Sequence, residues 1–129
     1  MAKRKECDWL VTAYDENKKV IEAFIIEQRT EKEANDEAEI EPCVLDSHDW
    51  TMVDAQKEAK RFVKEWGQTQ KEVKEVNGFR GSSLAVSEMA INFGYIWVDN
   101  FKKWIYKDNS NFDERDEIVL DYIKENYCE

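Results

Sequence analysis

The sequence predicts an α+β fold: a small antiparallel sheet with one short acidic helix, followed by a helical C-terminal half. Two stretches near the N-terminus, residues 9–14 and 20–26, are rich in aromatic and β-branched residues, which pack well on the surface of a sheet. After residue 54 the apolar residues recur at intervals of three and four, which is the spacing of a helix. With one proline and four glycines among 129 residues, the chain has few breaks, and this favours long helices over a many-stranded sandwich.

The first two strands are joined by residues 15–19, a polar stretch of hairpin-loop length. Glu22 interrupts the apolar run of the second strand, so one face of that strand is expected to meet solvent near this point. The third strand is expected at residues 43–45 and again, after a break, at residues 50–53. The whole chain is expected to be one domain (1–129), made of a strand-strand-helix-strand unit (1–54) and a helical part (55–129).

An acidic helix is predicted to connect the second and third strands. Thr30 and Glu33 have the spacing of a capping box, in which each side chain accepts a hydrogen bond from the backbone N–H of the other residue. The apolar stripe of this helix is thin, formed mainly by Ala34 and Ala38, and such small side chains let a helix lie close to a sheet. Pro42 is expected to end the helix, because proline disfavours the helical conformation of the residue before it.

Three segments in the first half of the chain carry a resemblance to a known group of proteins. Residues 9–14, the helix start at residues 30–34 and the segment 49–51 resemble a pattern found in small, uncharacterised phage and prophage proteins. The resemblance brings no known active site with it. It implies a setting, phage against host, and with it an anti-defence protein that acts in the cytoplasm of the host cell.

A long helix is predicted from Ala55 to Val76. Asp54 is a favourable N-cap, apolar residues follow at helical spacing, and Asn77–Gly78 supplies a helix end. Gly67 lies within the apolar stripe and costs an uninterrupted helix about 1 kcal/mol relative to alanine. The alternative is that the helix stops at Gly67 and restarts.

A second long helix is predicted from Leu84 to Tyr106, with apolar residues around much of its circumference. Such a helix must be covered on more than one side, by the sheet, by neighbouring helices or by a second protein chain. The alternative for residues 95–98 is a strand, because periodicity separates short apolar runs poorly into helix and strand. A last helix is expected to follow Asn111, which has capping-box spacing with Glu114.

The net charge of −10 disfavours direct contact with nucleic acid or with an anionic membrane. The charge is unevenly spread: residues 1–54 carry 15 acidic and 7 basic side chains, residues 55–82 carry 4 and 7, and residues 83–129 carry 10 and 5. We expect no membrane-spanning segment, because no apolar run approaches the length that crosses a bilayer. Three cysteines without metal-type spacing, and no signal peptide, predict reduced thiols in the cytoplasm.

No catalytic, metal-binding or cofactor-binding residue is assigned from the sequence. His48 is the only histidine and has acidic neighbours, but one histidine cannot supply a His-rich metal set, and a loop is expected at this position. Cys43 with His48 would make a thiolate pair, yet a cysteine at the start of an apolar strand more often packs as a small hydrophobe. We therefore expect a protein that is not an enzyme and needs no cofactor.

Carboxylates concentrate between residues 31 and 49, and these are the candidate partner-binding residues: Glu31, Asp36, Glu37, Glu39, Glu41, Asp46 and Asp49. Carboxylates three and four residues apart on a helix stand about 5–6 Å from one another. Phosphates along one DNA strand have a spacing of the same order, so one interpretation is imitation of a nucleic acid. The alternative is an acidic face that only keeps the protein soluble.

These observations favour a non-enzymatic inhibitor that binds the basic surface of a host protein or ribonucleoprotein, such as a CRISPR or restriction effector. Such a protein would contact neither nucleic acid nor a membrane directly. The alternative is an adaptor module that forms a homodimer through its aromatic helix at residues 84–106. Ionic strength separates the two, because charge-driven binding weakens with salt and apolar assembly does not.

Overall fold

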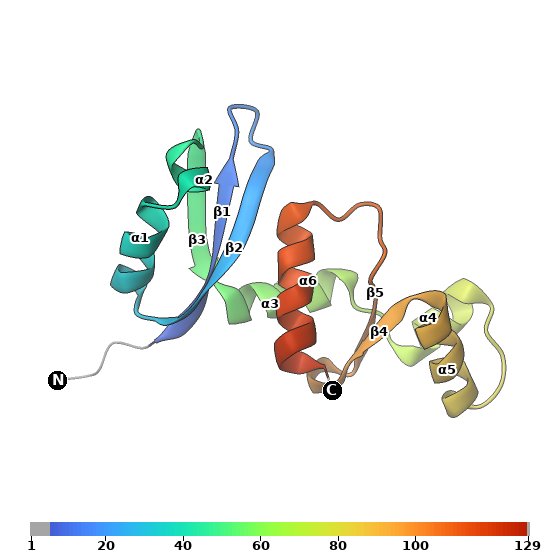
Figure 1. Ribbon diagram of the computed structural model, residues 1–129. Helices are drawn as coiled ribbons and strands as arrows, with labels where there is room; N and C mark the ends of the chain where they lie inside the picture. The colour runs from blue at the N-terminus through green and yellow to red at the C-terminus, as the bar shows by residue number, and fades with distance from the viewer. Residues whose placement is uncertain (1–5, 129) are drawn as a thin grey trace. The chain divides into compact units, whose positions relative to one another are not determined.

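A computed structural model describes residues 6–128 and confirms the α+β fold (Figure 1). The strands are β1 (Cys7–Tyr14), β2 (Val20–Arg29), β3 (Asp49–Asp54), β4 (Tyr95–Val98) and β5 (Lys103–Tyr106). The helices are α1 (Glu31–Glu39), α2 (Pro42–Leu45), α3 (Ala55–Trp66), α4 (Gln70–Asn77), α5 (Ser83–Phe93) and α6 (Glu114–Tyr127), with a short 3-10 helix, η1 (Asp99–Phe101). No helix in this described range is both long enough and apolar enough to span a membrane.

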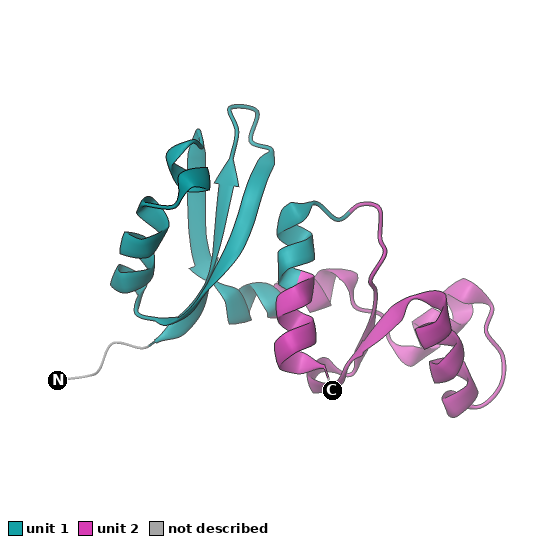
Figure 2. Cartoon of the chain, viewed as in Figure 1, with its two compact units in different colours: residues 1–59, 112–119 teal, residues 60–111, 120–129 magenta. Residues whose placement is uncertain are grey.

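The described chain divides into two compact units, shown in separate colours in Figure 2. Unit 1 comprises residues 1–59 and 112–119, and unit 2 comprises residues 60–111 and 120–129. Unit 1 therefore takes in the first turns of α3 and of α6 besides the strand-strand-helix-strand segment. This division assigns each charged side chain to one of two bodies.

Unit 1 is built on a three-stranded antiparallel sheet with the order β2-β1-β3. In the central strand, Leu10 lies opposite Ile25 of β2 and Val53 of β3. Both Leu10 and Val11 are fully buried, although their side chains point to opposite faces of the strand. A strand covered on both faces needs apolar residues at successive positions, and this explains the nearly unbroken apolar run of β1.

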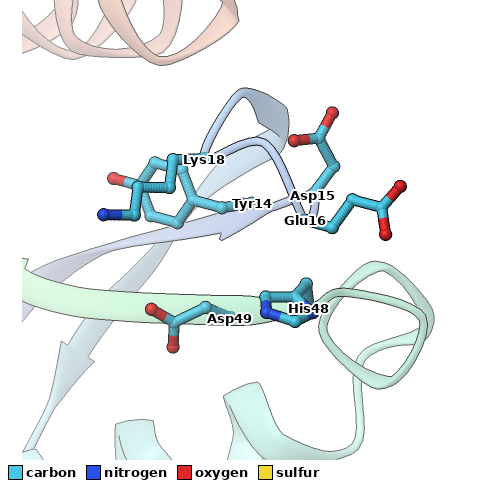
Figure 3. A pocket seen from close by; sticks show the side chains of 6 residues that line it. All are labelled: Tyr14, Asp15, Glu16, Lys18, His48 and Asp49. Atoms are coloured by element: carbon cyan, nitrogen blue, oxygen red, sulfur yellow. The ribbon is translucent and has the colours of Figure 1, made fainter.

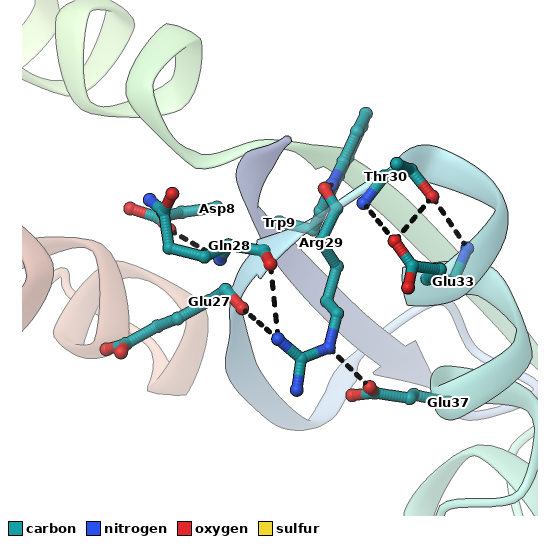
Figure 4. Close-up of polar contacts among 8 residues, drawn as sticks. All are labelled: Asp8, Trp9, Glu27, Gln28, Arg29, Thr30, Glu33 and Glu37. Carbon is teal, nitrogen blue, oxygen red and sulfur yellow. Dashed lines mark hydrogen bonds and ion pairs between the residues drawn. The ribbon is translucent and has the colours of Figure 1, made fainter. Parts of the chain in front are cut away.

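The capping box of α1 is confirmed, as the dashed lines of Figure 4 show. The Thr30 hydroxyl accepts from the Glu33 backbone N–H at 3.3 Å, and the Glu33 carboxylate accepts from the Thr30 N–H at 3.1 Å. Ala34 and Ala38 are fully buried in a cluster with Val11 of the sheet. The thin alanine stripe thus packs α1 against the sheet, and the rest of the helix surface stays in solvent.

The prediction that residues 43–45 begin the third strand is wrong, because they lie in the short helix α2. Pro42 occupies its first turn, where proline is favourable since its missing N–H would have no helical partner. Glu41 is extended, as expected of a residue before proline. The same proline therefore follows the end of α1 and begins α2, and β3 starts only at Asp49.

The predicted long helix of residues 55–76 is divided into α3 and α4, which confirms the alternative of a break at Gly67. The residue after Gly67 pairs with β5: Gln68 N–H donates to Trp104 O at 2.8 Å, and Trp104 N–H donates to Gln68 O at 2.7 Å. Thr69 then forms a second capping box with Glu72. Thr69 therefore starts a new helix within the range where one long helix was predicted.

The predicted long helix of residues 84–106 is also wrong, and the alternative strand at residues 95–98 is confirmed. Helix α5 ends at Gly94, whose φ of 107° lies in the region that favours glycine. The chain then forms the β4–β5 hairpin, in which Trp97 lies opposite Trp104. The apolar residues of this range thus belong to a helix and to a hairpin, and treating both as one helix made its whole circumference look apolar.

Helix α6 begins with a capping arrangement other than the one predicted. Asp113 and Asp116, not Asn111 and Glu114, exchange the two hydrogen bonds: Asp113 Oδ1 accepts from Asp116 N–H at 2.9 Å, and Asp116 Oδ2 accepts from Asp113 N–H at 3.1 Å. Asn111 donates its backbone N–H to Asn109 Oδ1 in the preceding loop. Aspartate is as good an N-cap as asparagine, so two caps competed in this segment.

The core of unit 2 is aromatic. Val73 of α4, Ala90 of α5, Tyr95 of β4 and Trp104 of β5 form a buried cluster. The Trp104 indole N–H donates to Gln70 Oε1 at 2.6 Å, so its polar group is satisfied within the unit. The hairpin is therefore part of the packed core of this unit.

Candidate functional site

The excess negative charge of the protein belongs to unit 1. Its residue ranges contain 20 acidic and 9 basic side chains, a net charge of −11, while those of unit 2 contain 9 acidic and 10 basic side chains, a net charge of +1. The sequence segments placed residues 113–117 with the C-terminal part, whereas the structure assigns these acidic residues to unit 1. A partner with a basic surface would therefore be attracted to unit 1 and hardly at all to unit 2.

All seven predicted partner-binding residues are exposed and belong to unit 1: Glu31, Asp36, Glu37, Glu39, Glu41, Asp46 and Asp49. Two of them form ion pairs: Glu37 Oε1 lies 2.8 Å from Arg29 Nε, and Asp36 Oδ2 lies 3.7 Å from Lys32 Nζ. The hydrogen bond that Arg29 donates to Glu37 raises the pKa of Arg29, and Figure 4 shows this guanidinium also donating to two backbone carbonyls. Asp36 and Glu37 thus present partly compensated charges to a partner.

Three other carboxylates, those of Glu39, Glu41 and Asp46, lie at the end of α1 and on either side of α2. We call them the α1–α2 carboxylates. Among residues 6–128 no ion pair involves them, although Glu39 Oε1 accepts from Asn35 Nδ2 at 3.0 Å. Within residues 6–128 these exposed carboxylates form no ion pair, a property that Glu31 shares, so they are strong candidates for contact with a basic partner.

A pocket of about 490 Å³ lies beside the β1–β2 hairpin (Figure 3). We call it the hairpin pocket, and its lining residues are Tyr14, Asp15, Glu16, Lys18, His48 and Asp49. Tyr14 lies opposite Asp49 across the β1–β3 pair, and the His48 backbone N–H donates to Tyr14 O at 2.9 Å. The pairing of β1 with β3 therefore brings together residues that are more than thirty positions apart in the sequence.

The loop side of the hairpin pocket is fixed by a compact turn. The Asp15 backbone N–H donates to Lys19 O at 2.9 Å, and Asp15 Oδ1 accepts from the N–H groups of Asn17 and Lys19 at 2.8 and 3.0 Å. Lys18 has a φ of 64°, in the left-handed region. The turn holds the Asp15 carboxylate by backbone hydrogen bonds, so its position is set before any ligand arrives.

The structure separates Cys43 from any role as a nucleophile beside His48. Cys43 packs against the core of unit 1 that α2 covers, while His48 is exposed at the hairpin pocket. Burial, and after it a hydrogen bond with Glu22, raises the pKa of the Cys43 thiol to about 11. The thiol is therefore protonated at neutral pH, whereas a nucleophilic cysteine acts as the thiolate.

The part of the chain that the structure describes contains no candidate metal site. Within residues 6–128, no group of three or more histidine, cysteine, aspartate or glutamate side chains has an arrangement suited to a metal ion. The three cysteines, Cys7, Cys43 and Cys128, are free thiols. Unit 1 therefore offers a ligand negative charge, exposed carboxylates and a pocket lined in part by Tyr14.

A second groove in unit 1, of about 620 Å³, lies where β2 meets the start of α6. Glu22, Asp113, Glu114 and Glu117 contribute its carboxylates. Three of these belong to the cap or first turn of α6, where acidic side chains stabilise the positive end of a helix. Their presence has this local explanation, so the groove is a weaker candidate than the hairpin pocket.

No family model matches the chain, and no curated protein or solved structure matches it.

Sequence reasoning identified Asp49 but missed Tyr14 and Lys18 as members of the hairpin pocket. Tyr14 was placed only as a strand residue and Lys18 only as part of a turn. The signal that would have joined them is the register of β1 and β3, which is fixed by pairing between distant segments.

Proposed function

We propose that this protein is a non-enzymatic inhibitor whose acidic unit binds the basic surface of a protein or ribonucleoprotein that handles nucleic acid. The phage resemblance implies only a setting, phage against host, and within that setting the proposed target is a CRISPR or restriction effector in the cytoplasm of a host cell. The observation that carries the proposal is the net charge of −11 on unit 1 against +1 on unit 2. In this proposal the protein needs no cofactor and contacts neither nucleic acid nor membrane itself.

The physical basis of the proposal is that the acidic unit and nucleic acid would compete for the same lysine and arginine side chains of the partner. A surface that binds nucleic acid presents lysine and arginine to phosphates, and a large part of its affinity comes from neutralising that charge. Carboxylates fixed on a folded protein can occupy the same surface and exclude the nucleic acid. Complementary charge also speeds the encounter of two proteins, so the acidic unit gains both in rate and in orientation.

The α1–α2 carboxylates are the part of unit 1 that we expect to contribute most. They are exposed and form no ion pair within residues 6–128, whereas Asp36 and Glu37 have Lys32 and Arg29 as partners. Breaking an existing ion pair to form a new one gains little, so the paired residues contribute less to binding. The ion pairs thus rank acidic residues that the sequence alone presents as one cluster.

The test uses a partner captured from a host lysate by the tagged protein and then purified. Glu39→Gln, Glu41→Gln and Asp46→Asn together remove three charges from unit 1 with little change in side-chain size. We expect the association rate at low salt to fall roughly tenfold, because each exposed charge contributes modestly and the three act together.

The matched control removes the same charge from unit 2. Glu65→Gln, Glu75→Gln and Glu88→Gln alter three exposed carboxylates of α3, α4 and α5. We expect this variant to associate at nearly the parent rate. If the association rate falls equally in both triple variants, binding depends on net charge alone. If it falls in neither variant, the acidic unit is not the binding surface.

A second candidate function, an apolar adaptor module, is favoured by one observation in unit 2. Leu84, Ile91 and Phe93 of α5 have exposed fractions of 71%, 58% and 57%. Apolar side chains exposed to this degree on one helix are typical of a contact surface. Binding that persists unchanged in 0.5 M salt, a concentration chosen because it screens charges beyond roughly 4–5 Å, would favour this adaptor function.

A further inference from the structure

The hairpin pocket combines a flat aromatic wall with negative charge. The Tyr14 ring supplies the wall, and the carboxylates of Asp15, Glu16 and Asp49 supply the charge. Lys18 is the only one of the six lining residues that is always cationic at neutral pH, so the lining carries an excess of negative charge. An aromatic face together with carboxylates is the environment that attracts a delocalised cation.

The two sides of the pocket are held by strand pairing and backbone hydrogen bonds of the fold. Its strand side is held by the pairing of Tyr14 with Asp49 and by the hydrogen bond from His48 N–H to Tyr14 O. Its loop side is held by the turn that closes between Asp15 and Lys19. Ligand binding would therefore lose little conformational entropy, whereas binding to a flexible loop is weakened by the entropy lost on ordering it.

Figure 3 shows how the side chains are directed. The charged ends of Lys18 and Asp49 and the Tyr14 hydroxyl lie toward one end of the pocket, and the carboxylates of Asp15 and Glu16 lie toward the other. The Asp15 carboxylate has one oxygen engaged by backbone N–H groups of the turn. Asp49 Oδ1 likewise accepts from the Trp50 backbone N–H at 2.9 Å, so each of these two carboxylates has one oxygen engaged. Asp49 is the carboxylate that we expect to meet an incoming cation beside the aromatic ring, because it lies toward the same end of the pocket as the Tyr14 hydroxyl (Figure 3).

We propose that the hairpin pocket receives the guanidinium group of an arginine side chain from the partner's basic surface. A guanidinium is planar, so it can stack on the Tyr14 ring while its N–H groups donate to a carboxylate at its edge. A lysine ammonium is a compact, strongly hydrated charge that cannot make both contacts in one plane. The pocket therefore discriminates between the two cations of a nucleic-acid-binding surface.

This inference rests on the proposed function, since it supplies one anchoring contact for the basic partner of unit 1. Lys18 provides a distinctive test of the inference, because its substitution is expected to increase the affinity and not to decrease it. The Lys18 ammonium competes with an incoming cation, so removing it strengthens binding of the guanidinium. Lys19 carries the same charge one residue further on and does not line the pocket, so it provides the control.

The experiment titrates N-acetyl-L-arginine methylamide into the isotopically labelled full chain at constant chloride, followed through backbone amide chemical shifts. The lysine analogue is titrated in parallel. We expect the amides of Tyr14, His48 and Asp49 to shift together and to saturate, with weaker binding of the lysine compound.

Four variants refine the test, and each is checked for an unchanged melting temperature. Lys18→Asn keeps a residue that tolerates a positive φ and should tighten arginine binding by roughly twofold to fivefold. Lys19→Asn should change binding by less than half as much. Asp49→Asn and Tyr14→Leu should each weaken binding by roughly twofold to fivefold.

Equal binding of the arginine and lysine compounds, equal effects of the two lysine substitutions, or shifts centred on α1 with none at the pocket would overturn the inference. These outcomes leave the proposed function standing, because it requires only that the acidic unit and nucleic acid compete for the partner. Failure of that competition, with normal titration of the pocket, would overturn the proposed function instead.

Discussion

Arg115 on α6 and Glu58 on α3 form an ion pair in unit 1, with Arg115 Nη2 3.0 Å from Glu58 Oε2. The exposed fractions of the two side chains are 23% and 9%, so solvent screens the pair only weakly. Arg115 Nε also donates to the hydroxyl of Thr12, a fully buried residue of β1, at 3.2 Å. One guanidinium thus ties the start of α6 to the sheet and to α3.

Arg115→Met should destabilise the protein by about 2–4 kcal/mol, because the Glu58 carboxylate then stays largely buried without its Arg115 partner. The measurement is the free energy of unfolding in urea. The double variant Arg115→Met with Glu58→Leu should lose less than the single variant, since it removes both charges together. An unchanged free energy of unfolding for Arg115→Met would show that α6 is held by its apolar contacts alone.

The change in stability caused by Gly67→Ala should have opposite signs for a helix that is broken at this residue and for a continuous helix. A Cβ at this position would meet the Val63 carbonyl oxygen, so we expect a loss of about 1–3 kcal/mol, as in other overpacked sites. In a continuous helix the same substitution would instead stabilise the protein by about 1 kcal/mol. Thermal unfolding followed by circular dichroism measures which sign holds.

Thr30→Ala and Thr69→Ala remove the hydroxyls of two matching capping boxes, one in each unit. Each should cost about 1 kcal/mol of stability. Because α1 belongs to unit 1 and α4 to unit 2, hydrogen exchange should report faster exchange in the helix whose cap is lost. Equal loss of protection in both helices from either substitution would contradict the local role of the caps.

The cap of α1 also predicts a pH dependence. Hydrogen bonds from the Thr30 backbone, and then from its side chain, lower the pKa of Glu33 below its ordinary value of 4.5. A carboxylate with a lowered pKa adds stability above its ordinary pKa, and this stability is lost as the pH falls through the lower, folded value. In Thr30→Ala, titration of Glu33 followed by carboxyl chemical shift should move toward the ordinary pKa. An unmoved titration would show that the backbone hydrogen bond alone sets it.

The elements that the sequence predicted correctly are those decided by neighbouring residues. The Thr30–Glu33 capping box and the helix end at Gly78 after α4 each depend on contacts within a few positions. Local hydrogen bonds and backbone preferences fix them, and a sequence displays both.

The elements that the sequence missed are decided by pairing across the chain. The break after α3 is coupled to Gln68 pairing with Trp104, and the hairpin that replaces the long helix needs Tyr95 opposite Tyr106. An apolar stripe cannot reveal either, because its periodicity holds for a helix and for two shorter elements alike. The acidic residues were recognised because they are close together in the sequence. Tyr14 was not placed beside Asp49, because that placement depends on the pairing of β1 with β3.

The central claim is that the acidic unit occupies a surface that nucleic acid would otherwise fill. The most direct measurement immobilises the protein with its captured partner and then adds an oligonucleotide that the partner binds. Inorganic phosphate at the same total charge is the control for simple screening. We expect the oligonucleotide to release the partner and phosphate to release far less. A stable ternary complex of protein, partner and oligonucleotide would contradict the central claim.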